Sequence, residues 1–182
     1  LDIFMGGLAV GSLIAARLTD RVRNTKHLLI AYGVLELVIA LYALLFPVVL
    51  TGMTPAYAFV YRNGPGGMTY NLLSSILSTV LLIVPTTLMG ATLPVLCRYY
   101  VASTSRMGTR TGLLYGVNTI GAAAGALFCG FWLIRYLGMQ NTVLLAFAVN
   151  LVIALAALVI GWLSNGTPAQ DADTGLPATA SP

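Results

Sequence analysis

Residues 28–50 read LLIAYGVLELVIALYALLFPVVL, an apolar run in which Glu36 is the only charged side chain. A helix of ~20 apolar residues crosses the ~30 Å hydrocarbon core of a lipid bilayer. A transmembrane β-strand would instead alternate in polarity over ~10 residues, and this run does not alternate. The stretch therefore predicts a transmembrane helix.

The rest of the chain has the same character. Of its 182 residues 58% are hydrophobic and 8% are charged, and the mean hydropathy is +0.90. So few charges cannot cover a surface that faces water. We therefore expect an all-α, polytopic membrane protein with four full transmembrane helices and a truncated first one. The predicted segments of this bundle, which occupies residues 1–163, are 1–17, 27–50, 70–97, 111–135 and 141–163.

The two ends of the chain differ from the four long runs. The first apolar run is ~24 Å long as a helix, and its basic residues follow it, whereas a signal peptide carries them in front. We expect it to be most of a transmembrane helix whose start is missing from the chain. The tail, residues 164–182, is rich in Pro, Ala, Thr and Asp and is predicted to be disordered.

Basic residues predict the orientation. Seven of the nine lie in the segments 17–27 and 98–111, which fall on one side of the membrane if the helices alternate. Basic loops remain in the cytoplasm, so the segments 51–69 and 135–141 are expected outside, and a short interfacial helix fits at 55–62. The C-terminus is then cytoplasmic, and we expect a bacterial inner membrane.

The first basic segment, residues 16–26, reads ARLTDRVRNTK. It resembles the loop between the second and third helices of major facilitator transporters. In this chain Arg23 stands at a position where the pattern of that loop has glycine. The resemblance implies roles for Asp20, Arg21, Arg23 and Lys26. An Asp at this boundary can bind a neighbouring helix N-terminus while the basic residues hold it in an ion-pair network. The alternative interpretation is a plain topology signal.

A broader resemblance covers residues 4–163. It rests on the segments FMGGLAVGSLIAARLTDR, LELVIALYALLFP, PTTLMGATLPVLCR and GLLYGVNTIGAAAGALFCGFWLIRYLG. Their order and spacing are similar to the membrane domain of spermidine synthase-like (polyamine aminopropyltransferase-like) membrane proteins. This family implies a bundle like one half of a major facilitator transporter, followed by a soluble synthase domain. No glycine-rich nucleotide-binding turn of such a domain is present in the sequence.

Small residues recur four positions apart along several runs, a spacing that lets two helix backbones approach closely in lipid. The pairs are Gly7 and Gly11, Gly112 and Gly116, Gly121 and Gly125, and Ala157 and Gly161. We favour packing within the chain over a dedicated oligomer face.

Polar side chains inside the runs mark a candidate site. Glu36 lies about nine residues into its run, ~13 Å from the cytoplasmic boundary, where a charge is costly unless it is paired. Thr87 and Asn118 fall at similar depths, and Tyr115 lies one turn nearer the cytoplasm, from which its hydroxyl can join them. In one interpretation Glu36 is neutral and bonds to Asn118, Thr87 or a carbonyl freed by Pro85. In the other it takes up a proton or a cationic substrate such as a polyamine.

Other chemistry finds little support. The chain has one histidine and two cysteines, without metal-ligand spacing, so we predict no catalytic residues, cofactor or metal. Its basic residues follow membrane topology and do not indicate nucleic acid. We expect a noncatalytic anchor or accessory subunit in contact with lipid and with other membrane chains. The alternatives are a transport component for polyamines or other organic cations, competent as an oligomer, and an enzyme whose soluble domain is encoded separately.

Overall fold

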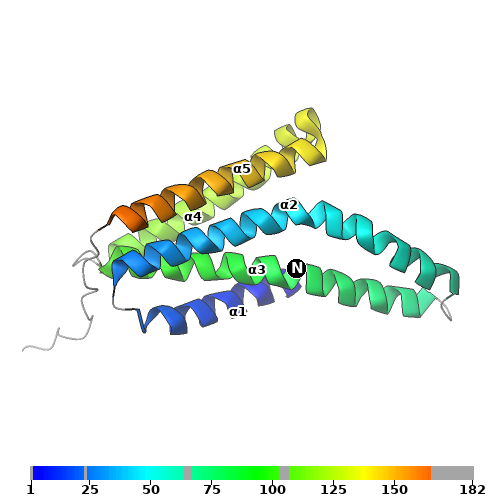
Figure 1. Cartoon of the computed structure of the whole chain (residues 1–182), viewed down its shortest axis with the longest axis horizontal. Helices are drawn as coiled ribbons and strands as arrows, with labels where there is room; N and C mark the ends of the chain where they lie inside the picture. Colours follow the sequence, from blue (N-terminus) through cyan, green and yellow to red (C-terminus); the bar gives the residue numbers. More distant parts are fainter. Residues whose placement is uncertain (1, 23, 64–66, 103–106, 165–182) are drawn as a thin grey trace, which may run out of the picture.

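The computed structural model describes residues 2–22, 24–63, 67–102 and 107–164, and these residues are almost entirely helical. Figure 1 shows how the helices are arranged. They are α1 (Asp2–Thr19), α2 (Thr25–Asn63), α3 (Gly67–Ala102), α4 (Met107–Phe128), the π-helix η1 (Cys129–Leu133) and α5 (Ile134–Leu163). The predicted all-α class is confirmed.

Four helical stretches in the described part of the chain are long and apolar enough to cross a membrane. They are Asp2–Thr19, Thr25–Arg62, Tyr70–Tyr100 and Thr111–Leu163. The first contains 18 residues, ~27 Å as a helix, which agrees with the predicted segment 1–17 within two residues. That the start of this helix is missing stays a prediction.

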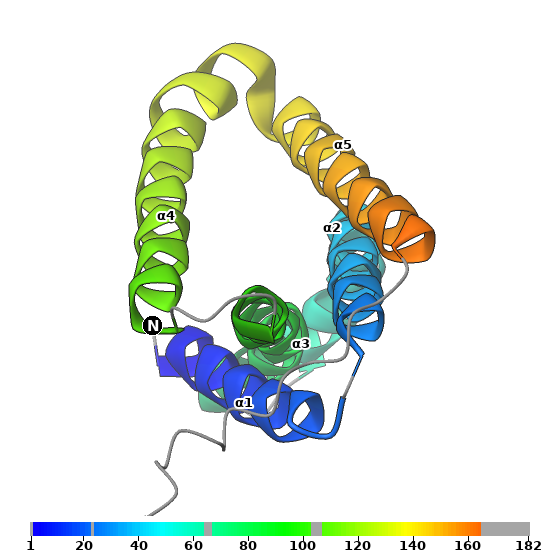
Figure 2. The same cartoon turned by 90° about the vertical axis from the view of Figure 1, so that its left-hand side faces the viewer.

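The fourth stretch is a helical hairpin formed by α4, η1 and α5. Gly138 has φ 75° and ψ 168°, a backbone conformation that essentially only glycine adopts. The chain reverses near this residue, so α5 returns toward the end at which α4 begins (Figures 1 and 2). The expected external loop at 135–141 is therefore reduced to a bend at one glycine.

Helices α2 and α3 are longer than predicted. At 39 and 36 residues they measure ~58 and ~54 Å. They continue side by side past the N-terminal end of α1 (Figure 1). The expected loop at 51–69 is thus largely helix. Tyr70 holds the ends of the two helices together, because its ring makes edge contacts with Tyr57 and Tyr61 at centroid distances of 6.3 and 5.7 Å.

Packing is centred on α3. Viewed along the bundle, α3 lies between α1 and α2, α5 packs on α2, and α4 stands apart (Figure 2). The packed helices meet through small residues: Gly33 of α2 faces Ala154 and Leu158 of α5, and Gly161 faces Ile30. Close backbone approach is how helices gain contact energy in lipid, where burial of apolar surface supplies little.

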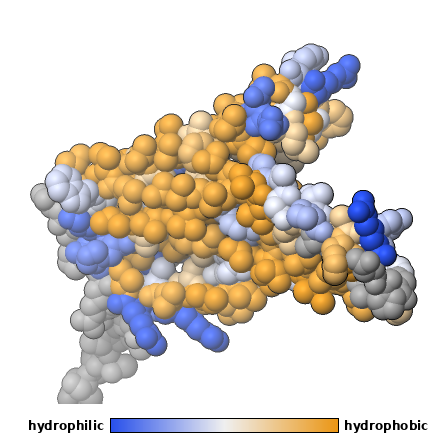
Figure 3. Space-filling view, turned by 45° about the vertical axis from the view of Figure 1, so that its right-hand side comes forward, coloured by the Kyte–Doolittle hydropathy of each residue, from blue (hydrophilic) through white to orange (hydrophobic). Residues whose placement is uncertain are grey.

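Charged and aromatic residues mark the two ends of the bundle. We call the end that carries Arg17, Arg21, Lys26 and Arg98 the basic end; it lies where α1, α3 and α5 finish and α2 and α4 begin. The surface between the ends is predominantly hydrophobic, with hydrophilic residues gathered at the ends (Figure 3). A membrane-embedded protein has this distribution.

Aromatic side chains gather at the opposite end as well. Trp132 of η1 stacks on Phe128 at 6.4 Å and contacts Tyr136 at 5.9 Å, and Arg135 lies 6.0 Å from the Tyr136 ring centroid. Tryptophan, tyrosine and arginine favour the boundary between hydrocarbon and water, so this cluster of side chains fits a membrane interface.

Candidate functional site

Three helices line a small polar cavity around Glu36, and Asn118 at the α4 side of this cavity is exposed. Glu36 and Tyr32 come from α2, Thr92 from α3 and Asn118 from α4, and the cavity measures about 170 Å³. The remaining walls are apolar and consist of Leu93, Leu96, Leu114 and Val117. We call this space the Glu36 cavity.

The polar residues of the cavity lie at one depth. Glu36 is 11 residues from the start of α2, Asn118 is 11 from the start of α4, and Thr92 is 10 from the end of α3. All three termini lie at the basic end, so each residue is ~15–17 Å from it along its helix. That distance is about half of the ~30 Å hydrocarbon core.

Two hydroxyl groups line the cavity. Tyr32 is one turn before Glu36 on α2, so the two side chains lie on the same face of the helix. Thr92 donates from Oγ1 to the Met89 carbonyl oxygen at 2.8 Å. Both hydroxyl groups keep oxygen lone pairs that can accept a further bond.

The predicted polar layer is only half assembled. The structure brings Glu36 and Asn118 to one cavity, whereas Thr87 lies at the contact between α3 and α1 and Tyr115 is 61% exposed. Helical depth does not specify the direction in which a side chain points: five residues along α3, from Thr87 to Thr92, turn the helix by ~140°. Thr87 and Tyr115 are therefore corrected as members of this layer.

Sequence reasoning missed Tyr32 and Thr92. Tyr32 carried a usable signal, because residues four apart on a helix share a face and a tyrosine at that distance can reach Glu36. Thr92 follows from the structure alone, since the orientation of α3 decides which of its threonines faces α2 and α4.

The carbonyl freed by Pro85 has a different partner from the one considered. Proline has no N–H, so the Leu81 carbonyl four residues earlier loses its helical donor. Tyr42 of α2 supplies the replacement: its hydroxyl donates to the Leu81 carbonyl oxygen at 2.5 Å. Glu36 is thus not needed for this carbonyl, and the bond links α2 to α3.

The glycines of α1 lie at the closest helix contact. A methyl group on Gly7 would overlap the Thr86 side chain, and one on Gly11 would overlap the Thr87 carbonyl. From the other side, Gly90 of α3 approaches the backbone of Leu8 in the same way. Only residues without a Cβ allow these backbones to come so near.

Among the described residues, no other helix packs against the four α4 glycines named below. A methyl group added at any of them meets nothing within 4 Å, and residues 111–128 are exposed apart from the half-buried Leu114 and Gly116. The four positions are Gly112, Gly116, Gly121 and Gly125. The expectation of packing within the chain is corrected here, because a small-residue spacing permits close approach without specifying the partner.

The basic loop motif is described in part. Arg21 is exposed, and the backbone N–H of Lys26 donates to Asn24 Oδ1 at 2.9 Å, which caps the start of α2. Asp20 lines a hollow of about 250 Å³ together with Arg98 of α3. Arg23 lies outside the described residues, and the ion-pair network stays a prediction.

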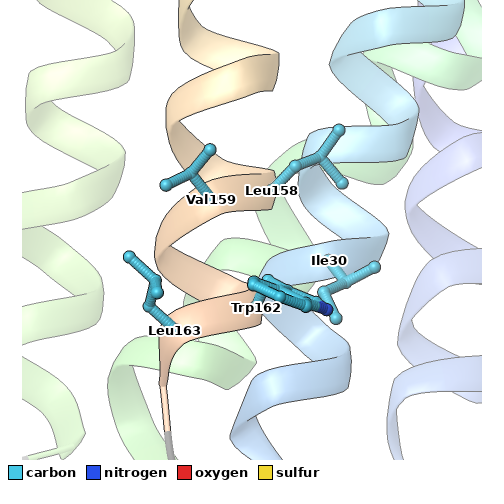
Figure 4. A pocket seen from close by; sticks show the side chains of 5 residues that line it. All are labelled: Ile30, Leu158, Val159, Trp162 and Leu163. Atoms are coloured by element: carbon cyan, nitrogen blue, oxygen red, sulfur yellow. The ribbon is translucent and has the colours of Figure 1, made fainter.

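A larger hollow of about 510 Å³ lies at the contact of α5 with α2. Leu158 and Trp162 extend from α5 toward Ile30 of α2, while Val159 and Leu163 point to the other side of α5 (Figure 4). Its lining is apolar apart from the indole N–H of Trp162, so it fits hydrocarbon.

The sequence matches no protein-family model and no curated protein. No solved structure matches the fold.

Proposed function

We propose that the chain is a noncatalytic membrane module that assembles with other membrane polypeptides through α4. The exposure of most of α4 carries this proposal, since of residues 111–128 only Leu114 and Gly116 are half-buried. A helix this rich in glycine and alanine offers few van der Waals contacts to lipid chains but packs well against a second helix backbone.

The described contacts of α4 support the same role. Within the described residues, α4 touches α3 over a short stretch and continues into η1, whereas α1 packs extensively on α3, α3 on α2 and α2 on α5. The bundle as a whole is proposed to be related to one half of a major facilitator transporter and to the membrane domain of synthase-like proteins, at the bacterial inner membrane with a cytoplasmic C-terminus. A single half cannot perform alternating access, which needs two halves that move against one another.

Mild extraction tests the assembly. The purified full chain is sized by light scattering and native mass spectrometry, and co-purifying chains are identified; a stoichiometric complex is expected and a monomer would contradict the proposal. Gly116→Leu together with Gly121→Leu should dissociate the complex. The matched control is Gly52→Leu on α2, at a position where a side chain also meets nothing within 4 Å.

A second role, as a component of a transporter for organic cations, is favoured by one observation. The Glu36 cavity places a carboxyl group near the middle of the predicted membrane span beside three further polar side chains. Ionisable residues at this depth typically belong to substrate or ion pathways. Uptake of a labelled polyamine into vesicles that contain the intact assembly tests this role, and it should be lost in Glu36→Gln.

A further inference from the structure

We propose that the Glu36 cavity binds a small alkylammonium ion, with the ammonium group at the Glu36 carboxylate and the carbon chain against the apolar walls. This inference deepens the transport role and rests on it for its purpose. The binding step itself is a property of the described residues of this chain.

The hydrogen-bond inventory of the cavity favours a ligand that donates. The Thr92 hydroxyl donates to the Met89 carbonyl at 2.8 Å. The acceptor atoms of the cavity are the two carboxylate oxygens, the two hydroxyl oxygens and the amide oxygen of Asn118, and they outnumber the remaining donor atoms, which are the amide nitrogen of Asn118 and the Tyr32 hydroxyl. An alkylammonium group has three N–H donors and no acceptor, so it complements this set.

The charge of the cavity favours a cation. Its lining contains one carboxyl group and no basic side chain. A carboxylate at this depth in a membrane is costly unless a partner of opposite charge accompanies it. A bound ammonium ion supplies that charge and forms charge-assisted hydrogen bonds, which are stronger than neutral ones.

The size and the walls of the cavity favour a carbon chain over a bare metal ion. A volume of about 170 Å³ exceeds the ~30 Å³ that one water molecule occupies in the liquid. Leu93, Leu96, Leu114 and Val117 line the space next to the polar residues. These walls leave a metal ion without ligands on one side but contact a short hydrocarbon favourably.

The sequence provides a selective probe, because Glu36 is the only glutamate among the 182 residues. Incorporation of glutamate labelled with ¹³C at the carboxyl carbon therefore yields one protein resonance for the site. Titration of the full chain with propylammonium chloride should shift this resonance saturably. Propanol and sodium chloride at matched concentrations should produce no saturable shift.

Each other outcome overturns the proposal. An unshifted resonance, or one that follows ionic strength linearly, shows that no ammonium ion binds at Glu36. An equal saturable response to sodium shows a general cation site, and an equal response to propanol shows that charge is not recognised. Either result removes the alkylammonium assignment.

A wall substitution tests the position of the carbon chain. Leu96→Phe fills the cavity and retains Glu36, and it should weaken propylammonium binding at least tenfold. The matched control is Leu82→Phe, an exposed position on the same helix that does not line the cavity, and it should bind as the unaltered protein does. Equal binding by both variants contradicts the proposed pose, and the titration of the unaltered chain decides the matter if Leu96→Phe does not fold.

The two proposals fail separately. An assembly that stays intact in native mass spectrometry but gives no Glu36 response removes the ligand proposal alone. A monomer that still shows the saturable shift removes the assembly proposal alone.

Discussion

The hydrogen bond between Tyr42 and the Leu81 carbonyl offers the sharpest test of how this bundle is held together. Pro85 leaves that carbonyl without its helical donor, and the Tyr42 hydroxyl reaches it from α2 at 2.5 Å. Tyr42→Phe removes the hydroxyl and retains the ring, so the carbonyl would lose its donor in a region where water does not replace it.

The expected cost is moderate. Hydrogen bonds between membrane helices contribute ~0.6 kcal/mol on average and ~1.7 kcal/mol at most, and the absence of a helical donor for the Leu81 carbonyl places this bond above the average. We therefore expect a loss of ~1 kcal/mol, about a fivefold change in the folding equilibrium. Reversible unfolding in mixed micelles of mild detergent and dodecyl sulfate measures it.

A double-mutant cycle isolates the cause. In Pro85→Ala the restored N–H can donate to Leu81 within α3, so Tyr42→Phe should then cost almost nothing. The matched control is Tyr61→Phe, since Tyr61 is 77% exposed, and it should leave stability unchanged. An equal cost of Tyr42→Phe in both backgrounds, or a cost no larger than that of the control, would refute the reasoning.

Three further predictions concern the backbone and the orientation. Gly11→Ala should destabilise the bundle by ~1–3 kcal/mol through overpacking against α3, whereas Gly6→Ala, which meets open space, should be neutral in the same unfolding assay; similar values for both would contradict the α1–α3 contact. Gly138→Ala should cost ~1–3 kcal/mol because its φ of 75° strains any side chain, and unchanged stability would show that the bend has another conformation. In a background without the native cysteines, Arg21→Cys and Arg62→Cys should react with a membrane-impermeant thiol reagent from opposite faces of the membrane, and labelling from one face would overturn the topology.

Part of the candidate site could be predicted from the sequence. Glu36 stands out because it is the one charge in a long apolar run, and Asn118 because it is an amide within another. Their common depth follows from the number of residues that separate each of them from a membrane boundary. Thr87 satisfied the same count and still points to α1, because depth leaves the rotation of each helix undetermined.

The packing of small residues shows the same division. Gly7 and Gly11 lie against α3, while the glycines of α4, with the same spacing, face open space. Spacing describes one surface of one helix. Which surface lies opposite depends on the path of the whole chain, including the reversal at Gly138.

The sequence by itself determined that the chain is helical and enters a membrane, and at which ends its charges gather. These properties depend on the partition of each segment between water and hydrocarbon, a free energy that adds up residue by residue along the chain. Only the tertiary structure decided that Tyr42 donates to the carbonyl freed by Pro85, that Thr92 joins Glu36, and that α4 stands apart. Those outcomes depend on the rotation and bending of helices against one another, because side-chain contacts form between surfaces that are distant in sequence.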